Sequence, residues 1–593
     1  MNSSSIQLLK RLWGHISIRR RGQFLLLLIL MVFTSFSEVL SIGAVLPFLA
    51  ILTDPVHVFV HPNSKPIINT LGLTEPKQLL LPLTIAFGLA AIAAGLMRLI
   101  LLWASSRLSF ATGADLSMNI YKRTLYQSYA VHVARNSSEV INGISTKANG
   151  VIYNIILPTL TLISSAVILV AILVAILSVD PIIALAGFLG FGLIYATVIL
   201  ATRRRLILNS RVVASESTRV IKSLQEGLGG IRDVLIEGSQ DKYCQIYSDA
   251  DQSLRRAQGS NLFVSASPRH GMEALGMILI SVMAYTLAKQ EDGIAKAVPI
   301  LGAIALGAQR MLPVLQQAYS SWAMIQGGEE SLKDTLNLLD QPLPVFADKI
   351  AREPMLFLRD IELKQIAFRY SPQSQWVLKG LDLKIYKGSK IGFIGETGSG
   401  KSTLLDVIMG LLEPSAGHLA VDGQVVNSIN QRTWQSHIAH VPQAIFLTDS
   451  TIAENIAYGV PAIQIDLNRV RKAARQAQID QNIESWPNRY KTIVGERGIR
   501  LSGGERQRIG IARALYKQTD IIILDEATIA LDTETEQSVM CAIDELSEEL
   551  TILIIAHRLT TLKSCSQIVE LSGGRIKRVG TYQEMVTTMI NIN

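Results

Sequence analysis

The stretch Gly395-Glu396-Thr397-Gly398-Ser399-Gly400-Lys401-Ser402-Thr403 decides the fold of the C-terminal part of the chain. It follows an apolar run, 390–394, that is typical of a strand, and it precedes 404–412, which is typical of a helix. In that context the backbone N–H groups of a glycine-rich loop close around phosphate oxygens. Lys401 is expected to reach the β- and γ-phosphates, and Ser402 to bind Mg²⁺. The stretch therefore predicts an α/β domain that binds a nucleoside triphosphate.

A second apolar run, Ile521-Ile522-Ile523-Leu524, ends in the acid pair Asp525-Glu526. A buried strand would deliver both acids to the carboxyl edge of a sheet, where α/β sheets bind ligands. Asp525 is expected to hold Mg²⁺, directly or through water. Glu526 is expected to act as the general base toward the attacking water. The alternative, two surface acids after a core strand, fits poorly beside the phosphate loop.

Between these motifs lies Leu501-Ser502-Gly503-Gly504-Glu505. A Ser-Gly-Gly sequence before a helix predicts another anion-binding N-terminus. Here the chain resembles the ATP-binding cassette (ABC) family, whose signature motif this stretch matches. In that family the signature contacts the γ-phosphate of ATP held by the opposite subunit. The resemblance covers essentially the whole chain and implies ATP and Mg²⁺ as ligands.

The resemblance gives roles to further residues. Tyr370 is similar to the aromatic residue that stacks on adenine, although a core tyrosine is the alternative. Gln443 resembles the Q-loop glutamine, which senses Mg²⁺ and contacts the membrane domain. Asp532 resembles the D-loop acid. His557 resembles the switch histidine that contacts the γ-phosphate, against the alternative of a structural histidine.

Two positions depart from the family pattern. Glu505 stands where Gln is common, and Ile529 stands where Ser usually precedes Ala-Leu-Asp. Neither change removes a catalytic group. Ile529 bears on the communication between the two ATP sites.

The N-terminal part of the chain is much more apolar than this cassette. Of the 593 residues 49% are hydrophobic and 18% are charged, and long apolar runs fill the first part. Runs of about 20 residues can span a bilayer, and they are found near 23–52, 80–108, 151–178, 182–202, 262–288 and 297–325. The predicted fold is multi-domain: an all-α transmembrane domain of six helices over 1–340, a linker over 341–356, and an α/β cassette over 357–593.

The basic residues predict the orientation in the membrane. The net charge is +8, and Lys and Arg cluster beside the spans, in the N-terminal segment, in 109–150 and at Arg203-Arg204-Arg205. By the positive-inside rule these stretches are cytoplasmic, so the charge indicates membrane topology and not nucleic-acid binding. We expect a bacterial inner membrane protein with both termini and the cassette in the cytoplasm. Three cysteines without metal-ligand spacing are typical of thiols in a reducing compartment.

The order of the motifs favours an exporter. The stretch 494–498 resembles the X-loop of ABC exporters, and six spans are fused ahead of one cassette. Since one chain then holds half of each ATP site, a homodimer with two sandwiched ATP molecules is expected. Short helices near 126–140 and 230–245 would couple the cassette to the membrane domain.

Charged residues inside the spans suggest the cargo. Arg98, Arg269 and Arg310 lie within predicted spans, where each charge costs about 2.5–3.5 kcal/mol by insertion scales. The hypothesis is that they line a cavity for an anionic headgroup, since one acid, Glu38, would have to balance all three. The alternatives are pairing within the membrane or snorkelling to the interface.

The membrane half also resembles lipid-linked oligosaccharide flippases, through the segment 37–48 and the outer loop 53–79. That resemblance implies a lipid-linked anionic glycan or glycolipid as cargo. Export of peptides or hydrophobic drugs remains an alternative, as does a nucleotide-gated channel or regulator. Soluble ABC proteins that act on nucleic acid are excluded by the spans.

Overall fold

The computed structural model describes residues 3–53, 55–60, 68–69, 72–177, 181–288, 311–344, 347, 355–527, 531–544, 549–556 and 559–590. The chain forms two compact units. One comprises Met1–Gln127 with Arg135–Pro342, and the other comprises Ser128–Ala134 with Leu343–Asn593. The short helix α6 (Tyr129–Ala134) thus belongs to the cassette unit, although its sequence lies among the membrane helices.

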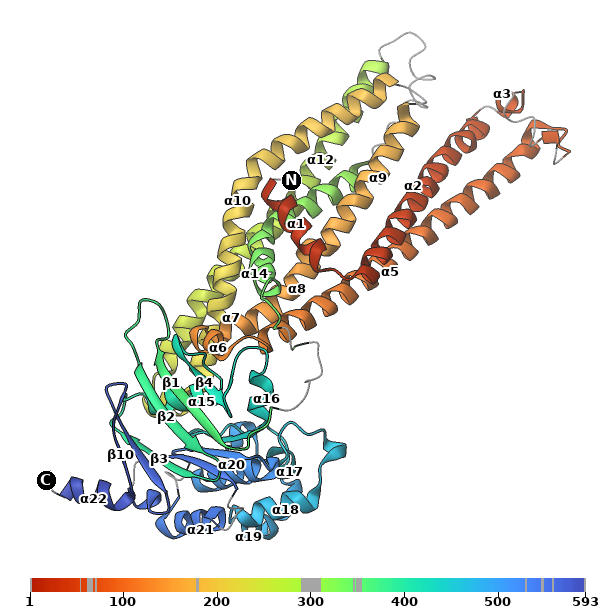
Figure 1. Ribbon diagram of the computed structural model, residues 1–593. Coiled ribbons are helices and arrows are strands. Elements are labelled where there is room, and N and C mark those ends of the chain that lie inside the picture. The colour runs from red at the N-terminus through yellow and green to blue at the C-terminus, as the bar shows by residue number, and fades with distance from the viewer. Residues whose placement is uncertain are drawn as a thin grey trace. The chain divides into compact units, whose positions relative to one another are not determined.

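The first unit is helical (Figure 1). Its helices are α1 (Ser3–His15), α2 (Ile18–Thr53), α3 (Pro55–Val60), α5 (Leu80–Leu125), α7 (Ser137–Asn142), α8 (Ala148–Val151), α9 (Leu157–Leu177), α10 (Pro181–Gly229), α11 (Ile231–Ile236), α12 (Gln240–Ala288) and α14 (Glu329–Leu339), with a further helical stretch over 311–327. A short 3₁₀ turn precedes α5, and π turns flank α8. Figure 1 shows α2 beside α5 and α10 beside α12, and both pairs are in contact.

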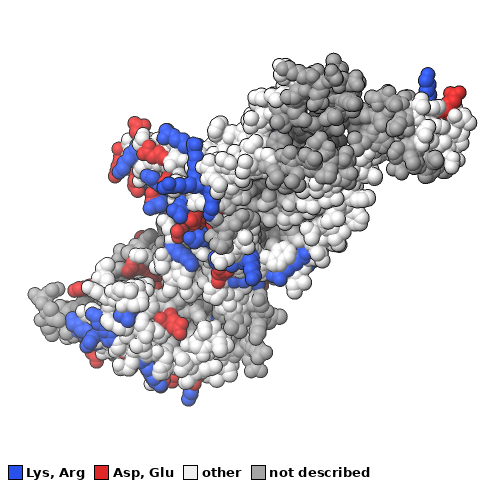
Figure 2. Space-filling view, turned by 90° about the horizontal axis from the view of Figure 1, so that it is seen from above, with Lys and Arg blue, Asp and Glu red and all other residues white. Residues whose placement is uncertain are grey.

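The long helices continue well past the predicted spans. α10 and α12 each have 49 residues, which at 1.5 Å per residue is about 70 Å and far exceeds the hydrocarbon core. Three stretches among the described residues are long and apolar enough to cross a membrane: Ile18–Ser41, Pro76–Leu125 and Ser137–Val174. The predicted spans 182–202 and 262–288 lie on α10 and α12, and the sixth begins outside the described residues. Figure 2 shows broad surfaces of the helical unit without charged side chains.

A proline in α12 organises the interior of this unit. Pro268 lacks the N–H that would bind the carbonyl of Val264. The hydroxyl of Tyr319 donates to that carbonyl at 3.0 Å. Gln316 joins the same network, because it accepts from the Tyr195 hydroxyl at 3.1 Å and donates to the carbonyl of the residue after Val264. Two side chains of the helical stretch 311–327 therefore bind the backbone carbonyls beside the proline, and Tyr195 of α10 holds one of them in place.

The cassette unit contains two sheets. The first has the order β2-β1-β4-β5 and consists of β1 (Asp360–Phe368), β2 (Leu378–Tyr386), β4 (Ala416–Val421) and β5 (Gln424–Val425), all antiparallel. The second has the order β10-β9-β3-β8-β7-β6 and consists of β3 (Lys390–Gly395), β6 (Ile438–Val441), β7 (Ile521–Asp525), β8 (Thr551–Ile555), β9 (Gln567–Ser572) and β10 (Arg575–Gly580). β3 lies between β9 and β8, and pairs with both in parallel. The carboxyl ends of β3 and β7 therefore meet at one edge.

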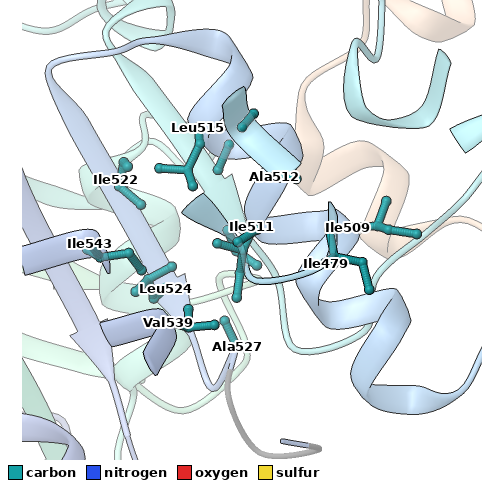
Figure 3. Packing of buried hydrophobic residues seen from close by; sticks show 14 of the residues in the cluster. Ile479, Ile509, Ile511, Ala512, Leu515, Ile522, Leu524, Ala527, Val539 and Ile543 are labelled. Carbon is teal, nitrogen blue, oxygen red and sulfur yellow. The ribbon is translucent and has the colours of Figure 1, made fainter. Parts of the chain in front are cut away.

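Helices cover the second sheet on both faces. They are α15 (Lys401–Ile408), α16 (Gln431–Ser436), α17 (Ile452–Ile456), α18 (Leu467–Gln476), α19 (Asp480–Ser485), α20 (Gly503–Lys517), α21 (Thr533–Asp544) and α22 (Tyr582–Ile590). Successive residues of β7 enter different cores: Ile522 and Leu524 pack with α20 and α21, while Ile521 and Ile523 pack with α15. Figure 3 shows the first of these cores. The strict alternation fixes both faces of β7, so that the strand delivers the acid pair, which begins at its last residue Asp525, to the carboxyl edge of the sheet.

Trp434 offers a test of the second core. The ring is fully buried, and its Nε1 donates to the carbonyl of Ile408 at 2.7 Å. Trp434→Phe is expected to lower the stability of the cassette by about 1–3 kcal/mol, because that carbonyl loses its partner. Trp434→Ala should cost about 3–5 kcal/mol, since it adds a cavity. Calorimetric unfolding of the full chain in detergent measures both, with the half-exposed Trp13→Phe as the control; an unchanged cassette transition in Trp434→Ala would contradict the expectation.

Candidate functional site

The phosphate loop has the context that its sequence predicts. β3 ends at Gly395 and α15 begins at Lys401. Gly395, Gly398 and Gly400 have φ of +144°, +83° and +100°, a region that side chains rarely adopt. A Cβ atom on Gly395 would lie 2.2 Å from the carbonyl oxygen of Leu571. The loop is therefore closed by glycines that no other residue can replace without distortion.

The loop also fits a phosphate group. The Nζ of Lys401 donates to the carbonyls of Gly395 at 2.7 Å and Glu396 at 3.0 Å, so the ammonium lies over the loop. The hydroxyl of Ser399 is buried and has no hydrogen-bond partner among the described residues. An orphaned buried hydroxyl is costly, and a phosphate oxygen would satisfy it. Glu396 and Thr397 lie on the exposed rim of the loop.

Acidic groups gather beside the loop. Asp525 ends β7 and accepts a hydrogen bond from the Ser402 hydroxyl. Burial raises the pKa of Asp525, and the charge of Glu526 adds to this effect. Asp406 lies one turn after Ser402 on α15, and burial, followed by the charge of Asp525, raises its pKa to about 6. Neighbouring carboxyl groups whose negative charges repel one another fit a site for a divalent cation such as Mg²⁺.

Sequence reasoning did not single out Asp406. Its spacing of four residues from Ser402 places it on the same face of the helix that follows the loop. That spacing is the signal that could have identified it.

The structure brings Gln443 and Glu526 together. The Nε2 of Gln443 donates to Oε2 of Glu526. Glu526 has a φ of +51°, and its N–H donates to the carbonyl of Ile555 at 3.1 Å. A left-handed backbone at a residue other than glycine costs about 1–3 kcal/mol and is often found at functional sites. The strain holds the Glu526 carboxylate at the edge where β7 ends.

Tyr370 is not a core residue. Its side chain is 51% exposed, and it meets Phe368 edge-on with ring centroids 5.0 Å apart. Its hydroxyl lies 3.2 Å from the Oγ1 of Thr403. The ring thus stands at the phosphate loop with area available for stacking on a base.

The signature motif caps a helix. Ser502 is the N-cap of α20, and its Oγ accepts from the Glu505 N–H at 3.3 Å. The Glu505 carboxylate accepts in return from the Ser502 N–H and hydroxyl, both at 2.8 Å. This reciprocal capping box accounts for Glu505 structurally. Gly503 and Gly504 form the first turn, whose N–H groups make the positive end of α20.

The remaining cassette predictions are only partly visible. Asp532 accepts from the Thr535 N–H at 2.9 Å and its hydroxyl at 2.7 Å, and these bonds hold the pKa of Asp532 below its usual value. His557 and Ile529 lie outside the described residues. Within the part of the chain that is described, no hydrogen bond or ion pair joins Ser502 or Asp532 to the phosphate loop. The structure thus links the loop, Asp525, Glu526, Gln443 and Tyr370 through contacts between their side chains.

His440, on β6 close to Gln443, gives a pH prediction. Burial lowers the pKa of His440 to about 4. Its ordinary value is about 6.5, so between pH 6.5 and 4 the unfolded chain binds a proton that the folded chain does not. The free energy of unfolding should therefore decrease as the pH is lowered through this window, by up to about 3 kcal/mol. His440→Phe should flatten the fall of the cassette melting temperature between pH 7 and 4.5, and the exposed His418→Phe should not; an identical pH profile in both variants would contradict this.

Arg98 and Arg269, the two span arginines that the structure describes, are each paired with a glutamate. Arg98 forms an ion pair with Glu38 across α5 and α2. The Nε of Arg269 lies 2.8 Å from Oε1 of Glu273, one turn along α12. The premise that a single glutamate would have to balance the arginines was therefore wrong, because Glu273 shares the fifth predicted span. The side chains of Arg98 and Arg269 remain 51% and 64% exposed, and Arg310 lies outside the described residues.

Comparison with known proteins assigns a family model to each of the two units. Residues 24–291 match the family model described as the ABC transporter transmembrane region, and residues 378–529 match the ABC transporter model. An ATP-dependent lipid A-core flippase from Alkalilimnicola ehrlichii is 31% identical over 400 residues, 67% of either chain. Another, from Cupriavidus metallidurans, is 27% identical over 86% of this chain and 84% of its own.

A solved structure extends the comparison to the fold. The structure of a bacterial Atm1-family ABC exporter with ATP bound aligns with a TM-score of 0.75, over 96% of each chain, at 22% sequence identity. Its likeness supports the arrangement of a helical domain followed by an α/β cassette.

Proposed function

Since this chain belongs to the ABC transporter family, as an exporter whose ATP hydrolysis is coupled to transport, we propose that it moves an anionic lipid outward from the cytoplasmic leaflet. The relatives named as lipid A-core flippases support a lipid cargo. A lipid-linked oligosaccharide is the narrower form of the same proposal. It would operate in a bacterial inner membrane with the cassette in the cytoplasm.

The proposal of an anionic cargo rests on one observation, the exposure of the side chains of Arg98 and Arg269. Arg98 and Arg269 keep about half or more of their side chains accessible, even though each has an acidic partner. A guanidinium can bind a phosphate oxygen pair as a fork while a neighbouring carboxylate keeps it charged within the membrane. We propose that Arg98, Arg269 and Arg310 meet phosphate groups on the cargo.

For ATP hydrolysis we propose the following roles. Lys401 and the glycine loop hold the phosphates, Tyr370 stacks on the base, and Ser402, Asp525 and Gln443 hold Mg²⁺. When bound, Mg²⁺ neutralises charge on the β- and γ-phosphate oxygens. Glu526 takes a proton from the attacking water, and His557 would contact the γ-phosphate.

The proposed active form is a homodimer. The nest formed by Ser502, Gly503 and Gly504 makes no hydrogen bond to the described phosphate loop of its own chain. A helix N-terminus of this kind binds anions. Its proposed ligand is the γ-phosphate of the ATP molecule that is bound by the phosphate loop of a second copy. Asp532 would lie at the same junction.

The cargo is tested in proteoliposomes by ATPase stimulation and by flipping of labelled lipids. A phosphorylated glycolipid and a lipid-linked sugar pyrophosphate are compared with an uncharged drug and a peptide. Combined Arg98→Ala, Arg269→Ala and Arg310→Ala should abolish stimulation by the anionic lipids and leave basal hydrolysis intact. Arg219→Ala, outside the spans and half-exposed, is the matched control. Full stimulation of the triple variant by either anionic lipid would contradict the proposal, as would stimulation by the drug or peptide alone.

A further inference from the structure

A cavity of about 280 Å³ lies in the helical unit among α1, α10 and α14. Three cationic side chains line it, namely Arg11, Arg211 and Lys333, against the two carboxylates of Glu329 and Glu330. Arg11 precedes the first predicted span, Arg211 follows the fourth, and Lys333 follows the sixth. In the predicted topology all three therefore lie on the cytoplasmic side of the spans.

Two of the cations are loosely held. The Nε of Arg211 lies 3.6 Å, and the Nζ of Lys333 3.7 Å, from carboxylate oxygens of the same residue, Glu330. Charge-assisted hydrogen bonds are normally 2.7–2.9 Å long, so both pairs are open contacts. The side chains of Arg211 and Lys333 are 65% and 57% exposed. One carboxylate thus serves two accessible cations.

The frame of the cavity is firmly built. The buried hydroxyl of Ser210 accepts from the Glu330 N–H at 3.0 Å, which ties α10 to the start of α14. The Ser5 hydroxyl donates to Glu329 at 2.7 Å, which ties α1 to the same point. Arg11 pairs with Asp340 at the C-terminal end of α14. The lining is therefore preorganised, while its cations can still rearrange.

The adjoining helix α1 carries the marks of an interfacial helix. Ile6 and Trp13 are about half exposed, and the guanidinium of Arg21 lies 5.8 Å from the centre of the Trp13 ring. Exposed apolar and aromatic side chains next to arginines are typical of helices that lie at the headgroup level. The cavity beneath α1 is thus placed where phospholipid headgroups are.

We propose that this cavity binds the phosphate of an anionic phospholipid of the cytoplasmic leaflet, with Arg211 and Lys333 as its ligands. The volume fits a headgroup, whose acyl chains would remain in the bilayer. Basic residues at this level attract anionic lipids, and the phosphate would compete with Glu330 for the two cations. The bound lipid would fix the start of α14 against α1 and α10. This site lies outside the spans that carry Arg98 and Arg269, and it is independent of the proposed cargo.

The test uses the full chain in nanodiscs of dioleoylphosphatidylcholine, with or without dioleoylphosphatidylglycerol, and no cargo. Phosphatidylglycerol should raise the melting temperature of the wild type. The variant Arg211→Gln with Lys333→Gln should lose at least half of that shift. Arg219→Gln with Lys222→Gln, on the same helix and also paired with glutamates, should keep it. Arg211→Lys with Lys333→Arg should keep it too, and Glu330→Gln should enlarge it because the competing carboxylate is gone.

An unchanged shift in the neutral double variant would overturn the proposal. A shift that inorganic phosphate produces equally in pure phosphatidylcholine would also overturn it, in favour of a soluble ligand. If the double variant does not assemble, Lys333→Gln alone decides by the same comparison. Native mass spectrometry of lipid retained by each variant gives the second readout.

Discussion

Glu526→Gln is expected to abolish steady-state ATP hydrolysis while ATP remains bound. The amide keeps the size of the side chain and can still meet Gln443, but it cannot take a proton from water. Loss of a general base lowers turnover by about 10²–10⁴-fold. Phosphate release from the full chain in liposomes, together with retention of radiolabelled ATP, measures the two effects separately.

The matched control is Glu505→Gln. Glutamine can complete the same capping box around Ser502, so this variant should hydrolyse ATP at close to the wild-type rate. If Glu526→Gln kept more than about a tenth of wild-type turnover, another group would be the base. If it lost ATP binding as well, the change would have disturbed the strained backbone of that residue.

Two inactive variants are expected to restore one working site when they are combined in a dimer. Lys401→Ala removes the cation of the phosphate loop. Gly503→Asp keeps a helix-compatible residue in the first turn of α20, but it sets a carboxylate where the γ-phosphate should bind. Each homodimer should be inactive. In the mixed dimer one phosphate loop and the opposite signature are both intact, so ATP should be trapped at one site.

Heterodimers isolated through two different affinity tags make this measurement clean. The control pairs the wild type with a chain that carries both changes, since each composite site then contains one defect and no ATP should be trapped. A mixed dimer as inactive as its parents, with both chains folded, would show that the signature does not act across the dimer. Both heterodimers carry the same two substitutions. A difference in ATP trapping between them can therefore not come from the number of substitutions.

The parts of the cassette that a local motif determines were predictable. The strand before the phosphate loop and the helix after it follow from the glycine pattern, and β7 follows from its aliphatic run. The contact between Gln443 and Glu526 was not, because it depends on β6 pairing with β7 across a long sequence separation. The strand order of the first sheet was not predictable either, because antiparallel pairing between its strands leaves no comparable sequence motif.

The membrane helices show a different limit. Hydropathy predicted a membrane span that ends near residue 108, and α5 continues beyond that span to Leu125. The hydrophobic signal stops at the edge of the bilayer, whereas backbone hydrogen bonding continues into the cytoplasm. Glu273 was overlooked for a related reason: within a mostly apolar run a single acid is inconspicuous, although its spacing from Arg269 is that of a helical ion pair.

The inclusion of α6 in the cassette unit has a practical consequence for recombinant work. A soluble fragment that starts at Leu343 would leave Ser128–Ala134 behind. Burial raises the pKa of Tyr129, and Asp406 and Tyr370 contribute to that shift. Cutting the chain at the linker would thus remove Tyr129, whose charge environment includes Asp406 and Tyr370. Kinetic constants measured on such a truncated fragment would describe a cassette that lacks one of its own segments, Ser128–Ala134.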